Sequence, residues 1–191
     1  MWIETERLVL RSAEPSDTEA YLRLWNSPFV QKYNMKALLD FDRAAAEIAE
    51  AAKSDRVLFL QRKEDPRMIG MIDFSEDTLR FGVSSCTLSY ALREDCSGLG
   101  YMTEAVRAAL RYAFETLGMD RVAGRVFSEN QASLRVLEKL NFVREGMLRE
   151  AVRGYGGRVY NDVLFSLSRA EFKSESASQM RNGPVTEGER K

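Results

Sequence analysis

Two glycines one residue apart, Gly98 and Gly100, stand directly before a segment with the pattern of a helix. Glycine weakens a helix start unless the backbone must turn sharply or let a ligand come close. A dinucleotide-binding loop needs a third glycine where Thr103 stands, and no Walker A lysine follows. Two interpretations remain: a tight turn, or a cradle in which free N–H groups at the helix start bind a pyrophosphate.

The chain contains no histidine, which excludes a Ser-His-Asp triad, a Cys-His pair and an H-E-x-x-H zinc site. Its two cysteines, Cys86 and Cys96, imply neither a disulfide framework nor a zinc site. Any general base is therefore a carboxylate, a tyrosine, a cysteine, a water chain or the substrate. Cys96 lies close to a helix start, a position that predicts a lowered thiol pKa; the alternative is an inert loop cysteine.

Hydrophobic periodicity predicts the elements that hold these residues. Alternation at Leu8 and Leu10 indicates a first strand, and Ser16 with Glu19 indicates a capping box before a short helix that Pro28 ends. Gly118 and Asn141 are expected to end two later helices in left-handed conformations. The other predicted helices cover residues 41–52, 101–117 and 130–140, and the other predicted strands cover residues 56–62, 67–75, 86–93, 121–127, 141–148 and 158–168.

A meander followed by alternating helices and strands predicts an α/β fold with a mixed, mostly antiparallel central sheet of about six to seven strands flanked by helices. We expect one domain over residues 1–172 and a polar, disordered tail over residues 173–191. The net charge of -1 gives no excess of positive charge that would indicate nucleic-acid binding, and no apolar run is long enough for a membrane span. The scarcity of cysteine favours the cytoplasm.

The run from Leu99 to Glu150, with GYMTEA, N-x-x-S, LEKLNF and EG-x-LR, resembles the core of the GCN5-related N-acetyltransferase (GNAT) family. More narrowly, it is similar to the branch that includes the ribosomal-protein N-terminal acetyltransferases. The resemblance extends from TERLVLR near the start to about residue 172. It implies a sheet that splays at the cofactor site, acetyl-coenzyme A as cosubstrate, and no metal.

The family's loop has the form Q/R-x-x-G-x-G/A, and Gly100 falls on its first glycine. Ser97 and Met102 depart from the pattern at its two ends. The resemblance implies that backbone amides bind the pyrophosphate, which does not depend on side-chain identity. The implied loop residues are Ser97, Gly98, Leu99, Gly100, Tyr101, Met102 and Thr103.

The resemblance also places the pantetheine arm beside the backbone of Tyr90, Ala91 and Leu92, with an N–H near Leu92 stabilising the oxyanion. In the N-x-x-S motif, Asn130 is implied to contact pantetheine and Ser133 to lie near the thioester sulfur as a weak acid. Alternatives stay open: Asn130 as a plain helix N-cap, and Ser133 as a first-turn residue without a role. Glu104 is expected to be a structural acid at the helix start.

The general base is not identified by sequence, because Thr87 and Ser89 stand where many relatives carry a glutamate. The remaining candidate carboxylates are Asp73, Glu145, Glu150 and Asp162. The implied reaction is direct acetyl transfer to a primary amine, either a protein N-terminus or a small molecule, by a monomer or homodimer. The alternative is a module that senses acyl-coenzyme A without turnover. The acceptor is expected to contact the two N-terminal helices and a mobile loop at residues 154–158.

Overall fold

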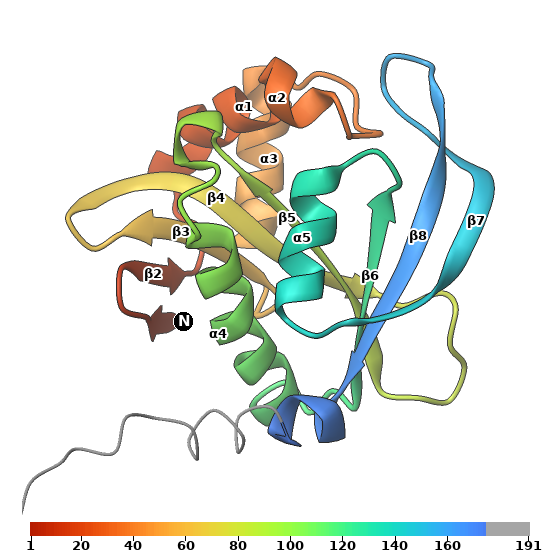
Figure 1. The fold of residues 1–191 in the computed structure, drawn as a ribbon. Coiled ribbons are helices and arrows are strands. Elements are labelled where there is room, and N and C mark those ends of the chain that lie inside the picture. Colours follow the sequence, from red (N-terminus) through yellow and green to blue (C-terminus); the bar gives the residue numbers. More distant parts are fainter. Residues whose placement is uncertain (175–191) are drawn as a thin grey trace, which may run out of the picture.

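The computed structural model describes residues 1–174, which form eight strands, the seven helical segments named below and a final helical segment at residues 169–174 (Figure 1). The strands are β1 (Trp2–Glu4), β2 (Leu8–Arg11), β3 (Val57–Arg62), β4 (Asp65–Glu76), β5 (Ser85–Leu92), β6 (Arg121–Phe127), β7 (Val143–Arg153) and β8 (Val159–Ser168). The helices are η1 (Pro15–Asp17), α1 (Thr18–Asn26), α2 (Pro28–Gln31), α3 (Phe41–Ala51), η2 (Glu94–Cys96), α4 (Tyr101–Glu115) and α5 (Gln131–Lys139).

All eight strands belong to one sheet in the order β1-β2-β3-β4-β5-β6-β8-β7. Every neighbouring pair is antiparallel except β5 and β6, which are parallel. The predicted mixed, mostly antiparallel α/β fold is therefore confirmed, with one strand more than the upper expected number. The additional strand, β1, pairs with β2 at the edge of the sheet.

Several predicted boundaries were wrong for local reasons. Ser16 lies inside η1 and does not cap α1, because the Asp17 carboxylate accepts the N–H of Glu14 at 2.8 Å and forms the cap one turn earlier. The predicted end of α1 before Pro28 is confirmed, since α1 ends at Asn26 and Ser27 is extended, but Pro28 also begins α2, as proline does at a first helical position. Helical structure continues to Ser174, two residues into the predicted tail, and residues 175–191 lie outside the described part of the chain.

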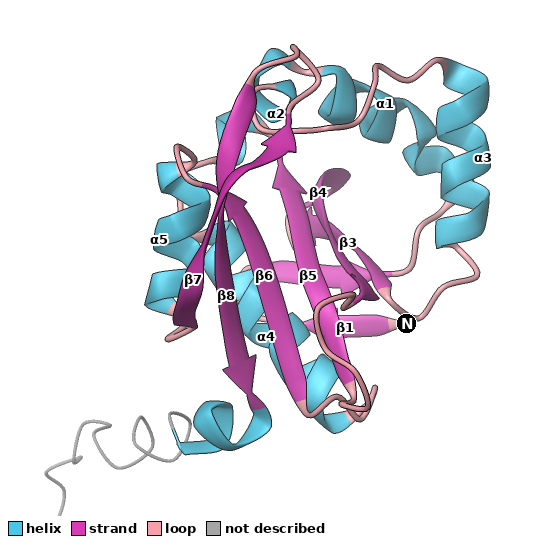
Figure 2. Cartoon of the chain, turned by 90° about the vertical axis from the view of Figure 1, so that its right-hand side faces the viewer, coloured by secondary structure: helices cyan, strands magenta, loops and turns pink. Residues whose placement is uncertain are grey.

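Two hydrophobic cores fill the two faces of the sheet, and Figure 2 shows the helices that cover each. On one face lie α4 and α5. The predicted apolar stripe of α4 is buried there: Met102, Ala105, Val106, Ala109, Leu110 and Ala113. On the other face, α1 and α3 pack through Tyr21, Leu24 and Ile48. Within residues 1–174 no helix is long and apolar enough to cross a membrane.

The parallel pair β5 and β6 separates halfway along its length. Pairing begins at Ser85 and Arg121 and ends at Leu88 and Gly124, whereas β5 continues to Leu92 alongside β4 alone. Gly124 lets α5 pack close to the strand, since a Cβ there would lie 2.8 Å from the Leu137 side chain. The sheet is thus splayed over the last four residues of β5, as the resemblance implied.

Candidate active site

A cleft of about 770 Å³ opens at the splay on the face covered by α4 and α5. It is bounded by the end of β5, the loop into α4, the end of β6, the start of α5 and the segment after α1. Of the predicted cofactor-binding residues, all but Leu99 line it. They are Tyr90, Ala91, Leu92, Ser97, Gly98, Gly100, Tyr101, Met102, Thr103, Asn130 and Ser133. The Leu99 side chain is 55% exposed.

The loop before α4 presents a row of free amides. Gly98 and Gly100 have φ of 77° and 84°, in the left-handed region that favours glycine, and the first helical bond runs from the Glu104 N–H to the Gly100 carbonyl. Within residues 1–174, the N–H groups of residues 98–103 donate to no protein acceptor. Free amides at a helix N-terminus form an anion site, so this geometry fits a pyrophosphate.

Glu104 fixes the position of this loop. Its Oε1 accepts the Thr5 hydroxyl at 2.6 Å and the Arg7 N–H at 2.8 Å, and its Oε2 accepts the Arg7 Nε at 2.7 Å. Arg7 also donates to the Leu99 carbonyl at 3.0 Å. Burial alone would raise the pKa of Glu104, but these hydrogen bonds together lower it. The expected structural role of Glu104 is confirmed, and Arg7 braces the loop from the β1–β2 turn.

At the end of β5, the backbone N–H and C=O groups of successive residues point alternately toward β4 and into the gap between β5 and β6. The Arg93 N–H donates to the Ile69 carbonyl, which makes Ala91 a hydrogen-bonded partner of Met71 on β4. The N–H and C=O groups of Tyr90 and Leu92 therefore point away from β4, into the splay. Of the three residues expected to present backbone to pantetheine, Tyr90 and Leu92 have backbone groups that face the gap, whereas Ala91 uses its backbone within the sheet.

Two hydroxyl groups meet at the start of α5. The Tyr90 hydroxyl lies 2.7 Å from the Ser133 Oγ, and Asn130 caps the helix by accepting the Ser133 N–H at 3.2 Å. Burial raises the pKa of Tyr90 to about 12. Asn130 is thus an N-cap that also borders the cleft, and Ser133 lines the cleft with its hydroxyl bonded to Tyr90. The phenol of Tyr90 was missed by sequence reasoning, which considered only its backbone.

Cys96 does not carry the activated thiol that its position predicted. It is buried in the core under α4, and this burial, reinforced by the charge of Asp95, raises its pKa. Cys86 is also buried, in β5, and burial raises its pKa to about 12. Tertiary packing overrides the local effect of the helix start, so neither thiol is a ready nucleophile.

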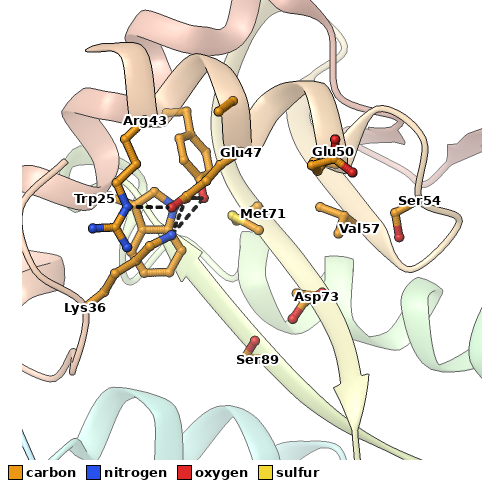
Figure 3. A pocket seen from close by; sticks show the side chains of 13 residues that line it. Trp25, Lys36, Arg43, Glu47, Glu50, Ser54, Val57, Met71, Asp73 and Ser89 are labelled. Carbon is orange, nitrogen blue, oxygen red and sulfur yellow. Dashed lines mark hydrogen bonds and ion pairs between the residues drawn. The ribbon is translucent and has the colours of Figure 1, made fainter. Parts of the chain in front are cut away.

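A second pocket, of about 640 Å³, lies on the opposite face of the sheet, between α1, α3 and strands β4 and β5 (Figure 3). Trp25 and Ser89 line both this pocket and the cleft. The two hollows therefore approach each other at the splay, where β6 no longer covers β5. None of residues 154–158 lines either hollow, and the Tyr155 N–H is bound to the Asn34 carbonyl at 2.7 Å.

Asp73 is the candidate base that faces the second pocket. It lies on β4 directly opposite Ser89, and within residues 1–174 it forms no ion pair. Burial raises its pKa, although the Ser89 hydroxyl acts in the opposite direction. A carboxylate with a raised pKa in a hollow is typical of a proton acceptor.

The other three candidate carboxylates are engaged or lie elsewhere. Glu145 pairs with Arg80 and accepts the Ser166 hydroxyl at 2.7 Å. Asp162 is buried against Arg125, whose Nε lies 2.6 Å from its carboxylate. Glu150 is exposed in a bulge of β7. None of the three lines either hollow.

Comparison with known families decides the identity of this fold and site. The family described as acetyltransferase (GNAT) domain matches residues 7–143, most of the folded chain. The chain belongs to the GNAT family of N-acetyltransferases. This assignment favours the enzyme over the sensing module that the sequence left open.

Among the relatives of this acetyltransferase, some match most of the chain and others match about half of it. An uncharacterized N-acetyltransferase of a Bacillus subtilis prophage is 30% identical over 172 residues, 88% of this chain and 93% of that protein. The ribosomal protein uS5 alanine N-acetyltransferase of Escherichia coli is 30% identical over 87 residues, 46% of this chain and 44% of that protein. A GNAT acetyltransferase from Bacillus anthracis superposes with a TM-score of 0.80 at 23% identity, over 90% of this chain and 100% of the other.

Proposed function

We propose that this acetyltransferase transfers the acetyl group of acetyl-coenzyme A directly to a primary amine held in the second pocket. One observation carries the proposal: hollows on opposite faces of the sheet converge at Trp25 and Ser89, where the strands separate. A thioester entering from one face and an amine entering from the other meet there without a covalent protein intermediate. The buried thiols of Cys86 and Cys96 support this direct route.

The cofactor side binds mainly through backbone. The amides of residues 98–103 hold the pyrophosphate, and the outward-facing groups of Tyr90 and Leu92 hold the pantetheine arm. The Leu92 N–H stabilises the oxyanion, a contribution of about 3 kcal/mol for one preorganised donor. Because Ser97 and Met102 alter only side chains of the loop, they leave this binding mode intact.

Proton transfer is divided between the two faces. Asp73, in the amine pocket, accepts the proton that the acceptor loses. On the cofactor side, Ser133, hydrogen-bonded to Tyr90, assists departure of the thiolate. A thiol with a pKa of roughly 8.5 leaves readily, so this assistance contributes modestly.

The acceptor is an amine of a protein N-terminus or of a small molecule. The uS5 alanine N-acetyltransferase modifies a ribosomal protein, which supports the first class. An N-terminal amine, with a pKa of about 7.7–8.0, also loses its proton more easily than a lysine amine near 10.4. The cytoplasmic location and the monomer or homodimer state stay predictions.

Initial-rate kinetics with a panel of N-terminal peptides and small amines tests the proposal. Release of the coenzyme A thiol is measured while acetyl-coenzyme A and the best acceptor are varied together. Direct transfer gives intersecting double-reciprocal lines. Parallel lines would indicate a covalent acetyl-enzyme and overturn direct attack. Binding of acetyl-coenzyme A without consumption across the panel would favour the sensing module.

A further inference from the structure

The second pocket contains a cage that already holds an alkylammonium group. The Nζ of Lys36 lies 5.0 Å from the centre of the Trp25 ring and 5.6 Å from that of Tyr21. It forms an ion pair with Glu47 and lies 3.3 Å from the Tyr21 hydroxyl. Two aromatic faces and a carboxylate are the groups that bind ammonium ions in proteins. Figure 3 shows the side chains of Trp25, Lys36 and Glu47 converging at one end of the pocket, away from Asp73.

Glu47 is positioned independently of Lys36. Its Oε1 is held by the Nε of Arg43 at 3.3 Å, one turn earlier on α3, and its Oε2 accepts the Tyr21 hydroxyl at 2.7 Å. Tyr21 in turn stacks on Phe59 of β3, with ring planes 5° apart. The cage walls therefore keep their geometry when the Lys36 ammonium leaves.

Lys36 itself is loosely tethered. Residues 34–40 have no regular secondary structure, and the neighbouring side chains of Met35 and Leu38 are 66% and 50% exposed. Two anchors hold the ends of the segment. The Asn34 carbonyl accepts the Tyr155 N–H at 2.7 Å, and Leu39 is buried in the core and exchanges two bonds with Asn26. The stretch between these anchors, residues 35–38, is mostly exposed, so it moves at low energetic cost while both anchors stay in place.

We infer that the cage of Tyr21, Trp25 and Glu47 is a cation subsite that selects acceptors carrying a second alkylammonium group, and that this group displaces Lys36. The inference rests on the proposed function, in that the reacting amine lies at the Asp73 end of the same pocket. The acceptor is then an aliphatic diamine or an N-terminal amine with a lysine side chain beside it. Lys36 is an internal competitor that occupies the subsite in the free enzyme.

Matched acceptors isolate the second charge. Lysinamide and norleucinamide share an α-amine and a four-carbon side chain, and only the first has a second ammonium; cadaverine and pentylamine form the corresponding small-molecule pair. We expect kcat/KM to favour the charged member of one pair by at least about fivefold, the scale of a cation–π contact at an exposed site. The pair that shows the preference identifies the source of the ammonium. Equal kcat/KM within both pairs would overturn the inference.

Two variants separate a binding cage from a structural ion pair. Glu47→Gln keeps the side-chain shape and should reduce the charged-to-uncharged ratio of kcat/KM to about one. Lys36→Met removes the competitor and should lower KM for the charged acceptor alone. If Lys36→Met instead raises KM for both members of a pair, the ion pair serves only to hold residues 34–40, and the inference is wrong.

A binding measurement distinguishes failure of the subsite from failure of the proposed function. Trp25 is one of two tryptophans, and the other, Trp2, is 60% exposed on β1 at the far edge of the sheet. In a Trp2→Phe variant, Trp25 reports the cage by its fluorescence. A saturable change with lysinamide or cadaverine, absent with the uncharged partner, supports the subsite even without turnover. Turnover with no such difference leaves the proposed function standing and refutes the subsite.

Discussion

Replacing Gly98 with alanine separates the two interpretations of the glycine loop, because α4 offers a matched control at its other end. Gly98 and Gly118 are both exposed, with φ of 77° and 71°, and no protein atom lies within 4 Å of a Cβ built on either. Only Gly98 lines the cleft. If the glycines serve only a tight turn, Gly98→Ala and Gly118→Ala should behave alike.

The expected stability cost is equal for the two variants. With no steric clash, each substitution costs the left-handed strain of a residue with a Cβ, about 1–2 kcal/mol. For a chain of this length that lowers Tm by roughly 2–8 °C. Binding should differ, because a Cβ at Gly98 intrudes where phosphate oxygens approach the amides of residues 98–103. Losing one or two hydrogen bonds to a charged group, about 1.5–3 kcal/mol each, weakens coenzyme A binding by at least about tenfold.

Calorimetric titration with coenzyme A and a thermal melt on both variants test this reasoning. We expect similar decreases in Tm, with the Kd for coenzyme A raised only in Gly98→Ala. A Gly98→Ala protein that shows the loss of Tm but binds coenzyme A with the wild-type Kd would refute the cradle and leave the tight turn as the explanation. A tenfold loss of affinity in Gly118→Ala would show that strain alone propagates along α4.

Three further outcomes are expected. Asp73→Asn should lower kcat by roughly 10²–10⁴-fold and raise Tm at pH 7. Burial raises the folded-state pKa of Asp73, so ionising this carboxyl costs stability above its unfolded-state pKa of about 3.9, and thermal melts below that pH should show no gain in Tm for the variant. Ser133→Ala should lower turnover by less than about a hundredfold, with little added by Tyr90→Phe, since the two hydroxyls form one chain. Glu104→Gln should lower Tm at neutral pH. Because the folded-state pKa of Glu104 is lowered, its carboxylate stabilises the folded protein above the unfolded-state pKa of about 4.3, so the difference in Tm between variant and wild type should shrink as the pH falls through the folded-state pKa.

The cofactor half of the site could be predicted from sequence because it is encoded in backbone conformation. Glycine at Gly98 and Gly100 signals left-handed turns, and the apolar period after them signals the helix whose free amides they expose. Left-handed Gly118 and Asn141 were confirmed for the same reason. The pKa of Cys96 was predicted wrongly because local position indicates a helix dipole, whereas burial depends on what packs over the residue.

The acceptor half could not be predicted, because its side chains come from separate elements and look ordinary within each. Tyr21 and Trp25 are four residues apart on α1, a spacing that indicates only a buried helix face. By sequence, Asp73 could not be distinguished from the other three candidate carboxylates. The β4–β5 register in the structure places it opposite Ser89, beside the splay.

The contrast between a cofactor half built from backbone groups and an acceptor half built from side chains has a functional consequence. In the proposed function, backbone amides hold the cofactor, so side-chain departures from the family loop such as Ser97 should leave the chemistry in place. The second pocket is lined mainly by side chains of α1, α3 and β4, and none of residues 98–103 lines it. Substitutions there can change which amine is accepted without disturbing the cradle. Acceptor specificity in this chain should therefore follow residues such as Glu47, and cofactor affinity should follow the conformation of residues 98–103.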